Sequence, residues 1–162
     1  MVKYHMRIPA IIFFIFFISA CNFTERIRSD EQLKTKIEEV VLSGEETLNF
    51  NDITEFDWNN LVIFTPYSSI EKYGSIFNID VKPILYTGMS YRDDVCLLVF
   101  LKNNKIINVV EYPRYPGDFS NNEIKKIGSE EAEFEIKENG DKTRSGKSWI
   151  VVQLKQNVIP SK

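Results

Sequence analysis

Three consecutive segments decide the fold: Val95-Cys-Leu-Leu-Val-Phe-Leu101, Lys102-Asn-Asn-Lys105 and Ile106-Ile-Asn-Val-Val-Glu-Tyr112. The outer two are mainly apolar, whereas the middle one is polar. Asparagine tolerates the positive φ that a two-residue hairpin turn demands. The segment Pro113-Arg-Tyr-Pro-Gly-Asp118 then breaks the pattern. The sequence therefore predicts a β-hairpin over residues 95–112.

Three further strands are predicted outside this hairpin. Leu61–Phe64 is a continuous apolar run, which predicts a strand covered on both faces or a central strand. Pro66 ends it, because proline lacks the amide that would extend a ladder. Residues 131–136 alternate strictly between glutamate and apolar side chains, the pattern of a half-buried strand. Asn139-Gly140-Asp141 is predicted to turn the chain, and Ser145-Gly146 to end the connection to a last strand over residues 147–154.

Helix starts are indicated by three capping boxes, in which a serine is followed three residues later by glutamate or glutamine. The boxes are Ser29-Asp-Glu-Gln32, Ser68-Ser-Ile-Glu71 and Ser120-Asn-Asn-Glu123. The first predicts a helix over residues 30–43, with Gly44 as its stop. The second predicts about two turns that end at Gly74, and the third a short helix over residues 121–127.

These elements predict an α+β fold, in which an N-terminal helix packs on an antiparallel sheet of four or five strands, with short helices between the strands. Residues 29–155 are expected to form a single domain and residues 156–162 a tail. Residues 45–60 are expected to hold either a short strand or an irregular loop. Residues 81–94 give no clear pattern.

The N-terminus has the layout of a secretory signal peptide. Lys3 and Arg7 precede an apolar run, Ile8–Ala20, that is too short to span a bilayer as a permanent helix. Its end, Ile18-Ser19-Ala20-Cys21, resembles the lipobox of bacterial lipoproteins. The alternatives are an ordinary secretory signal that carries a cysteine by chance and an uncleaved N-terminal anchor.

The resemblance implies that the chain is cut between Ala20 and Cys21 and that the Cys21 thiol carries a diacylglyceryl group. Residues 1–20 would then be the signal peptide and residues 21–28 a lipidated tether. The protein would be held by this lipid at the cell membrane or the outer membrane, exposed outside the cytoplasm. Asn22 stands where aspartate retains many lipoproteins in the inner membrane, which favours the outer membrane if the source has one.

A second resemblance lies in the mature part of the chain. Residues 56–67 read Phe-Asp-Trp-Asn-Asn-Leu-Val-Ile-Phe-Thr-Pro-Tyr. This segment is similar to the pattern FDW-x-x-L-x-I-F-x-P-Y of a group of small uncharacterised bacterial lipoproteins. The resemblance implies no activity.

Charge and histidine content exclude several classes of function. Without residues 1–20 the chain keeps 18 of its 20 basic residues and all 23 acidic ones. This balance argues against binding nucleic acid or, by charge alone, anionic lipid. His5, the only histidine, lies in the signal peptide. Its removal excludes Ser-His-Asp and Cys-His catalysis and zinc sites that need histidine.

Cys96 has no intramolecular partner if Cys21 carries lipid, so no disulfide is expected. It lies in an apolar strand, where a thiol behaves as a small buried hydrophobe rather than a nucleophile. No catalytic residue, metal site or cofactor is predicted.

Three acidic segments are candidate sites. Arg92-Asp93-Asp94 could bind a cation or act as an acid–base pair, but a solvated turn is the favoured interpretation. Adjacent residues of a strand face opposite sides, so the two carboxylates would not meet. Glu138-Asn-Gly-Asp141 resembles a calcium loop only superficially, since it lacks the spacing and the distal glutamate. The alternating glutamates in residues 131–135 offer either an acidic row for a basic partner or a plain solvent face.

Aromatic residues beside prolines are the remaining signal. Tyr67 follows Pro66, and Arg114 and Tyr115 lie in the break after the hairpin. Tyrosine and arginine anchor protein interfaces, although tyrosines also cap ordinary cores. We expect Tyr67, Arg114 and Tyr115 to lie partly exposed and close together, and Trp58 to pack against the sheet.

The sequence thus favours a lipid-anchored, non-enzymatic envelope protein that binds an envelope or extracellular protein or a small ligand. The alternatives are a structural or assembly lipoprotein of an envelope complex and a hydrolase that uses carboxylates.

Overall fold

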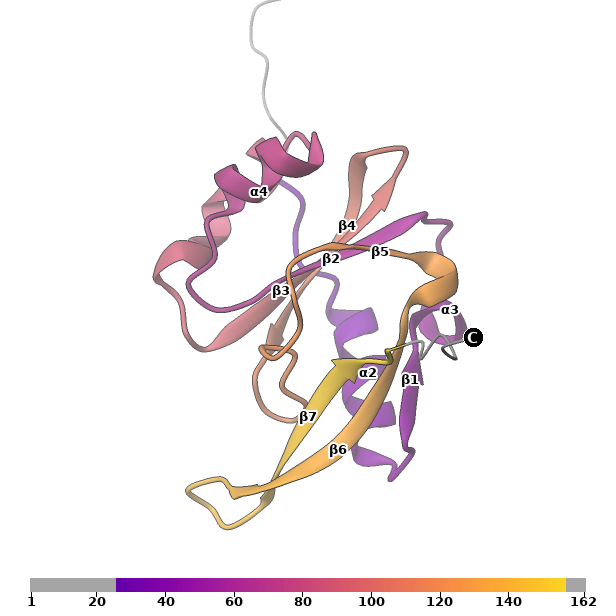
Figure 1. The fold of residues 1–162 in the computed structure, drawn as a ribbon, viewed down its shortest axis with the longest axis vertical. Helices are drawn as coiled ribbons and strands as arrows, with labels where there is room; N and C mark the ends of the chain where they lie inside the picture. Colours follow the sequence, from indigo (N-terminus) through magenta and orange to yellow (C-terminus); the bar gives the residue numbers. More distant parts are fainter. Residues whose placement is uncertain (1–25, 157–162) are drawn as a thin grey trace, which may run out of the picture.

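Two antiparallel sheets form the framework of the structure, a computed structural model that describes residues 26–156 (Figure 1). The four-stranded sheet has the order β4-β3-β2-β5, with β2 (Asn60–Phe64), β3 (Val95–Lys102), β4 (Lys105–Pro113) and β5 (Lys126–Gly128). The three-stranded sheet has the order β1-β6-β7, with β1 (Thr47–Asn49), β6 (Glu133–Lys142) and β7 (Ser148–Leu154).

In the part of the chain that the structure describes, helices are few and mostly short. The α-helices are α2 (Glu31–Leu42), α3 (Phe50–Ile53) and α4 (Ile70–Phe77). The 3₁₀ segments are η2 (Lys82–Thr87), η3 (Met89–Tyr91) and η4 (Ser129–Glu131). The predicted α+β class is confirmed, and the helix expected over residues 30–43 corresponds to α2. The segments that the sequence left open hold β1 and α3, and then η2 and η3.

The strands divide into two sheets instead of the single sheet expected. β6 pairs with β1 on one side and with β7 on the other. The outer edge of β7 is filled by residues 118–122, so it pairs with no strand of the four-stranded sheet. A hydrophobic pattern indicates which face of a strand is buried, but it does not indicate which edges pair.

Two apolar cores hold these layers together. The inner core lies between α2, the three-stranded sheet and one face of the four-stranded sheet. The outer core lies on the opposite face, under α4, η2 and η3. Successive residues of β2 enter the two cores alternately, with Leu61 and Ile63 in the inner core and Val62 and Phe64 in the outer. The prediction that this strand is covered on both faces is confirmed.

The hairpin of β3 and β4 is also confirmed. Asn103 and Asn104 turn with φ of 51° and 61°, the two positive values that a two-residue turn requires. The expected packing of Trp58 is observed as well, since its buried ring meets Phe100 of β3 edge-on at a centroid distance of 5.2 Å.

Helix α2 begins one residue later than the first capping box predicts. The carboxylate of Asp30, not the hydroxyl of Ser29, accepts hydrogen bonds from the amides of Gln32 and Leu33, at 3.1 and 2.9 Å. The Ser29 hydroxyl instead accepts from the amide of Glu111 on the outer edge of β4. Ser29 is therefore committed to the sheet.

Helix α4 likewise starts at its neighbouring serine and passes through its predicted stop. The Ser69 hydroxyl accepts from the amide of Lys72. Gly74 lies inside the helix, where a Cβ would come within 2.6 Å of Val81 Cγ1. The glycine thus permits a close approach, and Asn78, with φ of 54°, ends the helix.

The helix predicted over residues 121–127 does not exist. Residues 126–128 form β5, in which Ile127 pairs with Leu61 and enters the inner core. Asn122 is buried and bonds to β7. Pairing and burial of these side chains outweigh the local capping signal.

The last turn is also displaced along the chain. Residues 139–141, where it was predicted, belong to β6, and residues 143–146 make the turn, with the Gly146 amide donating to the Thr143 carbonyl at 2.8 Å. The Asn139 side-chain oxygen accepts a hydrogen bond from the Asp141 amide. This local turn lies within β6, where the pairing with β7 shifts register between Glu138 and Lys142. The strand expected over residues 131–136 begins at Glu133, because η4 precedes it.

The predicted signal peptide, the cleavage site at Ala20 and Cys21, and residues 21–25 of the tether lie outside the described residues, as do residues 157–162 of the tail.

Candidate binding surface

The four-stranded sheet brings together the ends of three strands. The last residue of β2, Phe64, pairs with Leu97 near the start of β3, and the last residue of β4, Pro113, pairs with Val95. The Tyr67 amide donates to the Arg92 carbonyl, and the Arg114 amide donates to the Asp94 carbonyl, each at 3.1 Å. We call this surface the sheet end and define it as residues 65–68, 90–94 and 113–116.

The structure places the three predicted binding residues at this one end. Tyr67 lies on the β2 side of residues 92–94, and Arg114 and Tyr115 lie on the β4 side. Tyr67 is 65% exposed, whereas Arg114 and Tyr115 are half-buried. Among the described residues, no hydrogen bond, ion pair or ring contact joins Tyr67 to the other two.

Tyr67 has a left-handed backbone, with φ of 61°. This conformation costs a bulky side chain roughly 1–2 kcal/mol. The turn around it is held by buried Ser68, whose amide donates to the Thr65 carbonyl and whose own carbonyl accepts from the Ser90 hydroxyl, at 3.3 and 3.2 Å. Those bonds maintain a backbone that turns the ring into solvent.

Tyr91 adds a second exposed ring to the sheet end. Its side chain is 90% exposed and it immediately precedes Arg92, to which Tyr67 is bonded. Sequence reasoning missed Tyr91 as a candidate, because the segment 81–94 had no readable pattern. Its position at the end of η3 follows only from the fold.

Arg92 is fixed between two carboxylates. Its Nε and Nη2 donate to the two oxygens of Asp94, each at 2.9 Å, and Nη1 donates to Glu111 of β4. The hydrogen bond from Arg92 lowers the pKa of Asp94, and that same bond raises the pKa of Arg92. Asp93 and Asp94 are exposed, as in the solvated turn that the sequence favours.

Arg114 is fixed in a different way, by a carboxylate and an indole. Its Nε and Nη2 donate to Oδ2 of Asp118 at 3.0 and 2.8 Å, and its Cζ lies 5.7 Å from the Trp149 ring centroid. Tyr115 contacts the same indole at 6.2 Å between centroids. Trp149 of β7 therefore connects the sheet end to the three-stranded sheet, a role that its place in an alternating strand did not indicate.

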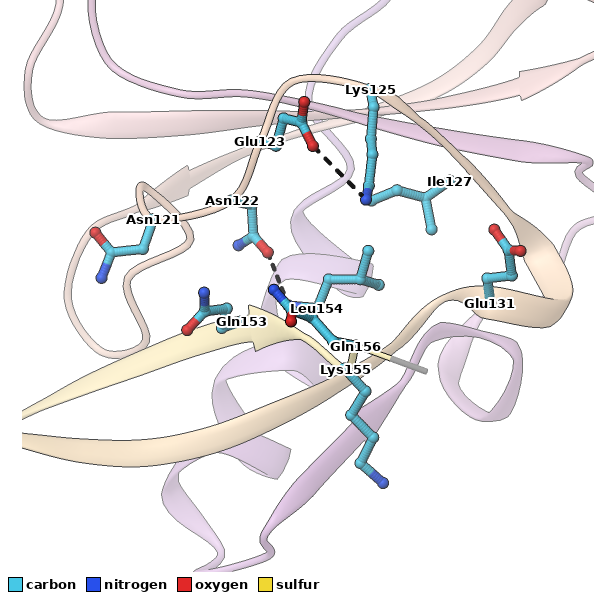
Figure 2. A pocket seen from close by; sticks show the side chains of 10 residues that line it. All are labelled: Asn121, Asn122, Glu123, Lys125, Ile127, Glu131, Gln153, Leu154, Lys155 and Gln156. Carbon is cyan, nitrogen blue, oxygen red and sulfur yellow. Dashed lines mark hydrogen bonds and ion pairs between the residues drawn. The ribbon is translucent and has the colours of Figure 1, made fainter. Parts of the chain in front are cut away.

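Apart from the sheet end, a hollow lies between residues 121–127 and the end of β7, with a volume of about 430 Å³. Figure 2 shows Lys125 and Glu123 facing one another across its rim, where their charged atoms are 3.8 Å apart. The floor contains Asn122, whose side-chain oxygen accepts from the Leu154 amide. The residues that line the hollow are mostly polar, and the hollow is open to solvent. The side-chain amide of Asn122 already hydrogen-bonds to β7.

Cys96 is buried as expected, with 1% of its surface exposed. Burial, with a smaller effect from Asp118, raises the pKa of its thiol to about 12. Within residues 26–156, no group of three His, Cys, Asp or Glu side chains is placed to hold a metal ion. No helix in this described range has the length and apolar character needed to cross a membrane.

Comparison with protein-family models, with curated proteins and with solved structures gave no match.

Proposed function

We propose that this protein is a lipid-anchored, non-enzymatic protein of the bacterial envelope whose domain binds another protein through the sheet end. The lipobox-like segment ending at Cys21 supports the anchor. One observation carries the choice of surface: Tyr67 keeps a costly left-handed backbone and presents its ring to solvent, at a sheet end that also carries the exposed side chain of Tyr91.

Physical reasons favour a protein partner here. Tyrosine and arginine supply much of the binding energy in protein interfaces. The sheet end carries both, and Arg92 and Arg114 are already immobilised by carboxylates. Pro66 precedes Tyr67 and fixes its own φ, so less entropy is lost on binding. Strain at an exposed position persists only where the surrounding structure imposes it, which favours a functional role.

The hydrolase alternative has weaker support. A general acid at neutral pH needs a carboxyl group whose pKa is raised. Among residues 26–156, the carboxyl groups with displaced pKa values are Asp30, Asp94 and Glu135, and in all three the pKa is lowered.

The test uses Tyr67→Gly, which separates stability from binding. Glycine adopts the left-handed backbone without strain. This variant should therefore unfold at a higher denaturant concentration than the wild type, with a free energy of unfolding that is larger by about 1 kcal/mol. It also removes the ring. Asn78→Gly is the matched control, because it relieves a φ of 54° on the exposed end of α4, away from the sheet end.

Binding is measured in the native cells with a photo-crosslinking amino acid at position 91, and at position 42 as a control. Leu42 is also well exposed but lies at the end of α2. We expect a discrete protein adduct from position 91 that Tyr67→Gly abolishes and Asn78→Gly preserves. Equal adducts from both positions, or a position-91 adduct unaffected by Tyr67→Gly, would contradict the assignment.

A further inference from the structure

Arg26 and Ile27, the first residues that the structure describes, contact and hydrogen-bond to η2. The Ile27 amide donates to the Pro83 carbonyl at 3.4 Å, and the Tyr86 hydroxyl donates to the Ile27 carbonyl at 2.6 Å. The Arg26 guanidinium lies over the Tyr86 ring, 5.6 Å from its centroid. Ile27 also packs against the outer core. Figure 1 shows this segment, in indigo, rising from α2 to the layer that contains α4.

This attachment shortens the connection to Cys21. Only four residues separate Cys21 from Arg26, and the five Cα–Cα steps between them span at most about 18 Å in a fully extended chain. A domain of this size has a radius of gyration of about 14 Å. A lipid on Cys21 would therefore keep the side of the domain that carries η2 close to the membrane.

That side carries residues suited to a membrane surface. We call it the tether face and define it as Arg26, Arg28, Lys82, Leu85 and Tyr86. The three basic residues are exposed, and no ion pair among the described residues engages them. Leu85 and Tyr86 are 40% and 39% exposed.

Two carboxylates lie near the tether face, Asp80 and Glu111. Asp80 is exposed and accepts from the Lys82 amide at 3.2 Å. Glu111, which raises the pKa of Tyr86 together with the larger effect of burial, is paired with Arg92. Asp80 keeps its negative charge, and the three basic residues of the tether face outnumber it, in a chain whose overall charge is negative.

We propose that the tether face lies on the membrane and binds the headgroups of anionic lipids. This inference rests on the proposed lipid anchor. The net negative charge argues against membrane binding by the domain alone, so the anchor provides the affinity and the tether face sets the orientation. Arginine and lysine are attracted to anionic headgroups, and tyrosine is favoured at the membrane–water interface.

The experiment places a photo-crosslinking amino acid at position 85, or at position 42 as the control. One sample is the native lipoprotein, reconstituted into vesicles of phosphatidylethanolamine and phosphatidylglycerol. The other is the chain from residue 21 onward, coupled through the Cys21 thiol to a maleimide lipid in the same vesicles. Buried Cys96 does not compete for coupling. Mass spectrometry reads the lipid adducts, and also the native modification of Cys21.

We expect lipid adducts from position 85 and few from position 42 in both samples. Changing Arg26, Arg28 and Lys82 to serine should lower the position-85 yield by about fivefold per charge, and phosphatidylcholine vesicles should give a similar loss. Equal yields from both positions, or none from position 85, would overturn the orientation. An unmodified Cys21 in the native protein, with position-85 adducts in the coupled sample, would refute the natural anchor and leave the tether face supported.

Discussion

Arg114 and Asp118 form an ion pair that links the two sheets. Nη2 of Arg114, which follows β4, lies 2.8 Å from Oδ2 of Asp118, whose side chain is only 4% exposed. The main chain of Asp118 bonds in turn to Ile150 and Val152 of β7. The Asp118 carboxylate also accepts from the Ser120 amide, so it fixes the loop as well as the arginine.

Asp118→Asn should destabilise the protein by about 2 kcal/mol, because it weakens charged hydrogen bonds at a buried site and leaves Arg114 without its counter-charge. Asp94→Asn is the matched control. It breaks an exposed pair with Arg92 and should cost less than about 1 kcal/mol. Urea denaturation measures both, and equal losses would show that the Arg114–Asp118 pair has no special role.

Gly74→Ala should destabilise the protein by about 1–2 kcal/mol, even though alanine favours helices, because its Cβ would collide with Val81. Thermal unfolding provides the measurement. The double variant Gly74→Ala/Val81→Ala should lose less stability than the sum of the two single variants. Additive losses would mean that the close approach is unimportant.

Cys96 should resist an uncharged thiol reagent in the folded protein and react after unfolding. Its pKa is raised from 9.0 to about 12 on folding. Between these values the unfolded chain loses the thiol proton while the folded chain keeps it. Stability should therefore be fully present below pH 9 and fall by up to about 1.4 kcal/mol per pH unit towards pH 12.

Cys96→Ala is the comparison for this pH dependence. It should cost about 1 kcal/mol at neutral pH and lose stability less steeply above pH 9. Tyr112, whose pKa burial also raises, titrates in both proteins and does not enter the difference. Rapid labelling of the native protein would show that the thiol is accessible.

Asn122→Ala should cost about 3 kcal/mol, because it leaves the Val152 carbonyl and the Leu154 amide on β7 without partners. Asn121→Ala, at the exposed neighbouring position, should change stability by less than about 0.5 kcal/mol. Guanidinium denaturation of the two variants checks this, and similar stabilities would contradict the role given to Asn122.

Cys21→Ala should abolish lipidation, so that the protein is retained uncleaved or released instead of partitioning into detergent. The reason is that the thiol is the acceptor of the diacylglyceryl group in the lipoprotein pathway that the lipobox resembles. Intact-mass spectrometry of the wild type provides the direct reading. A mature wild-type chain with a free Cys21 thiol would exclude the anchor.

Sequence reasoning worked where a signal was local and unopposed. The two asparagines of the hairpin turn needed only their own tolerance of positive φ, and the apolar run of β2 needed only burial on both faces. It failed where adjacent residues compete: Asp30 caps α2 beside Ser29, and Ser69 caps α4 beside Ser68. At Ser120 the local signal was opposed by the pairing of Ile127 with Leu61, 66 residues earlier.

The candidate surface was only partly predictable, for a related reason. Proline and aromatic residues marked Tyr67, Arg114 and Tyr115, and strand pairing puts all three at one end of the sheet. The contributions of Tyr91 and Trp149 depend on how segments distant in sequence pack. The left-handed backbone of Tyr67 depends on a turn that the Ser90 hydroxyl holds through one hydrogen bond to the Ser68 carbonyl, and no local pattern specifies it.

The segment that follows the tether has a mechanical consequence. Ser29 and Asp30 run parallel to β4, and the amides of Asp30 and Glu111 bond across this junction at 2.8 and 3.1 Å. A force that pulls residue 26 against the sheet end acts along these strands. Such a force loads the two hydrogen bonds between residues 29–30 and β4 in shear. Both bonds must then break together, instead of one after the other. The domain should therefore resist traction along β4 better than peeling across it.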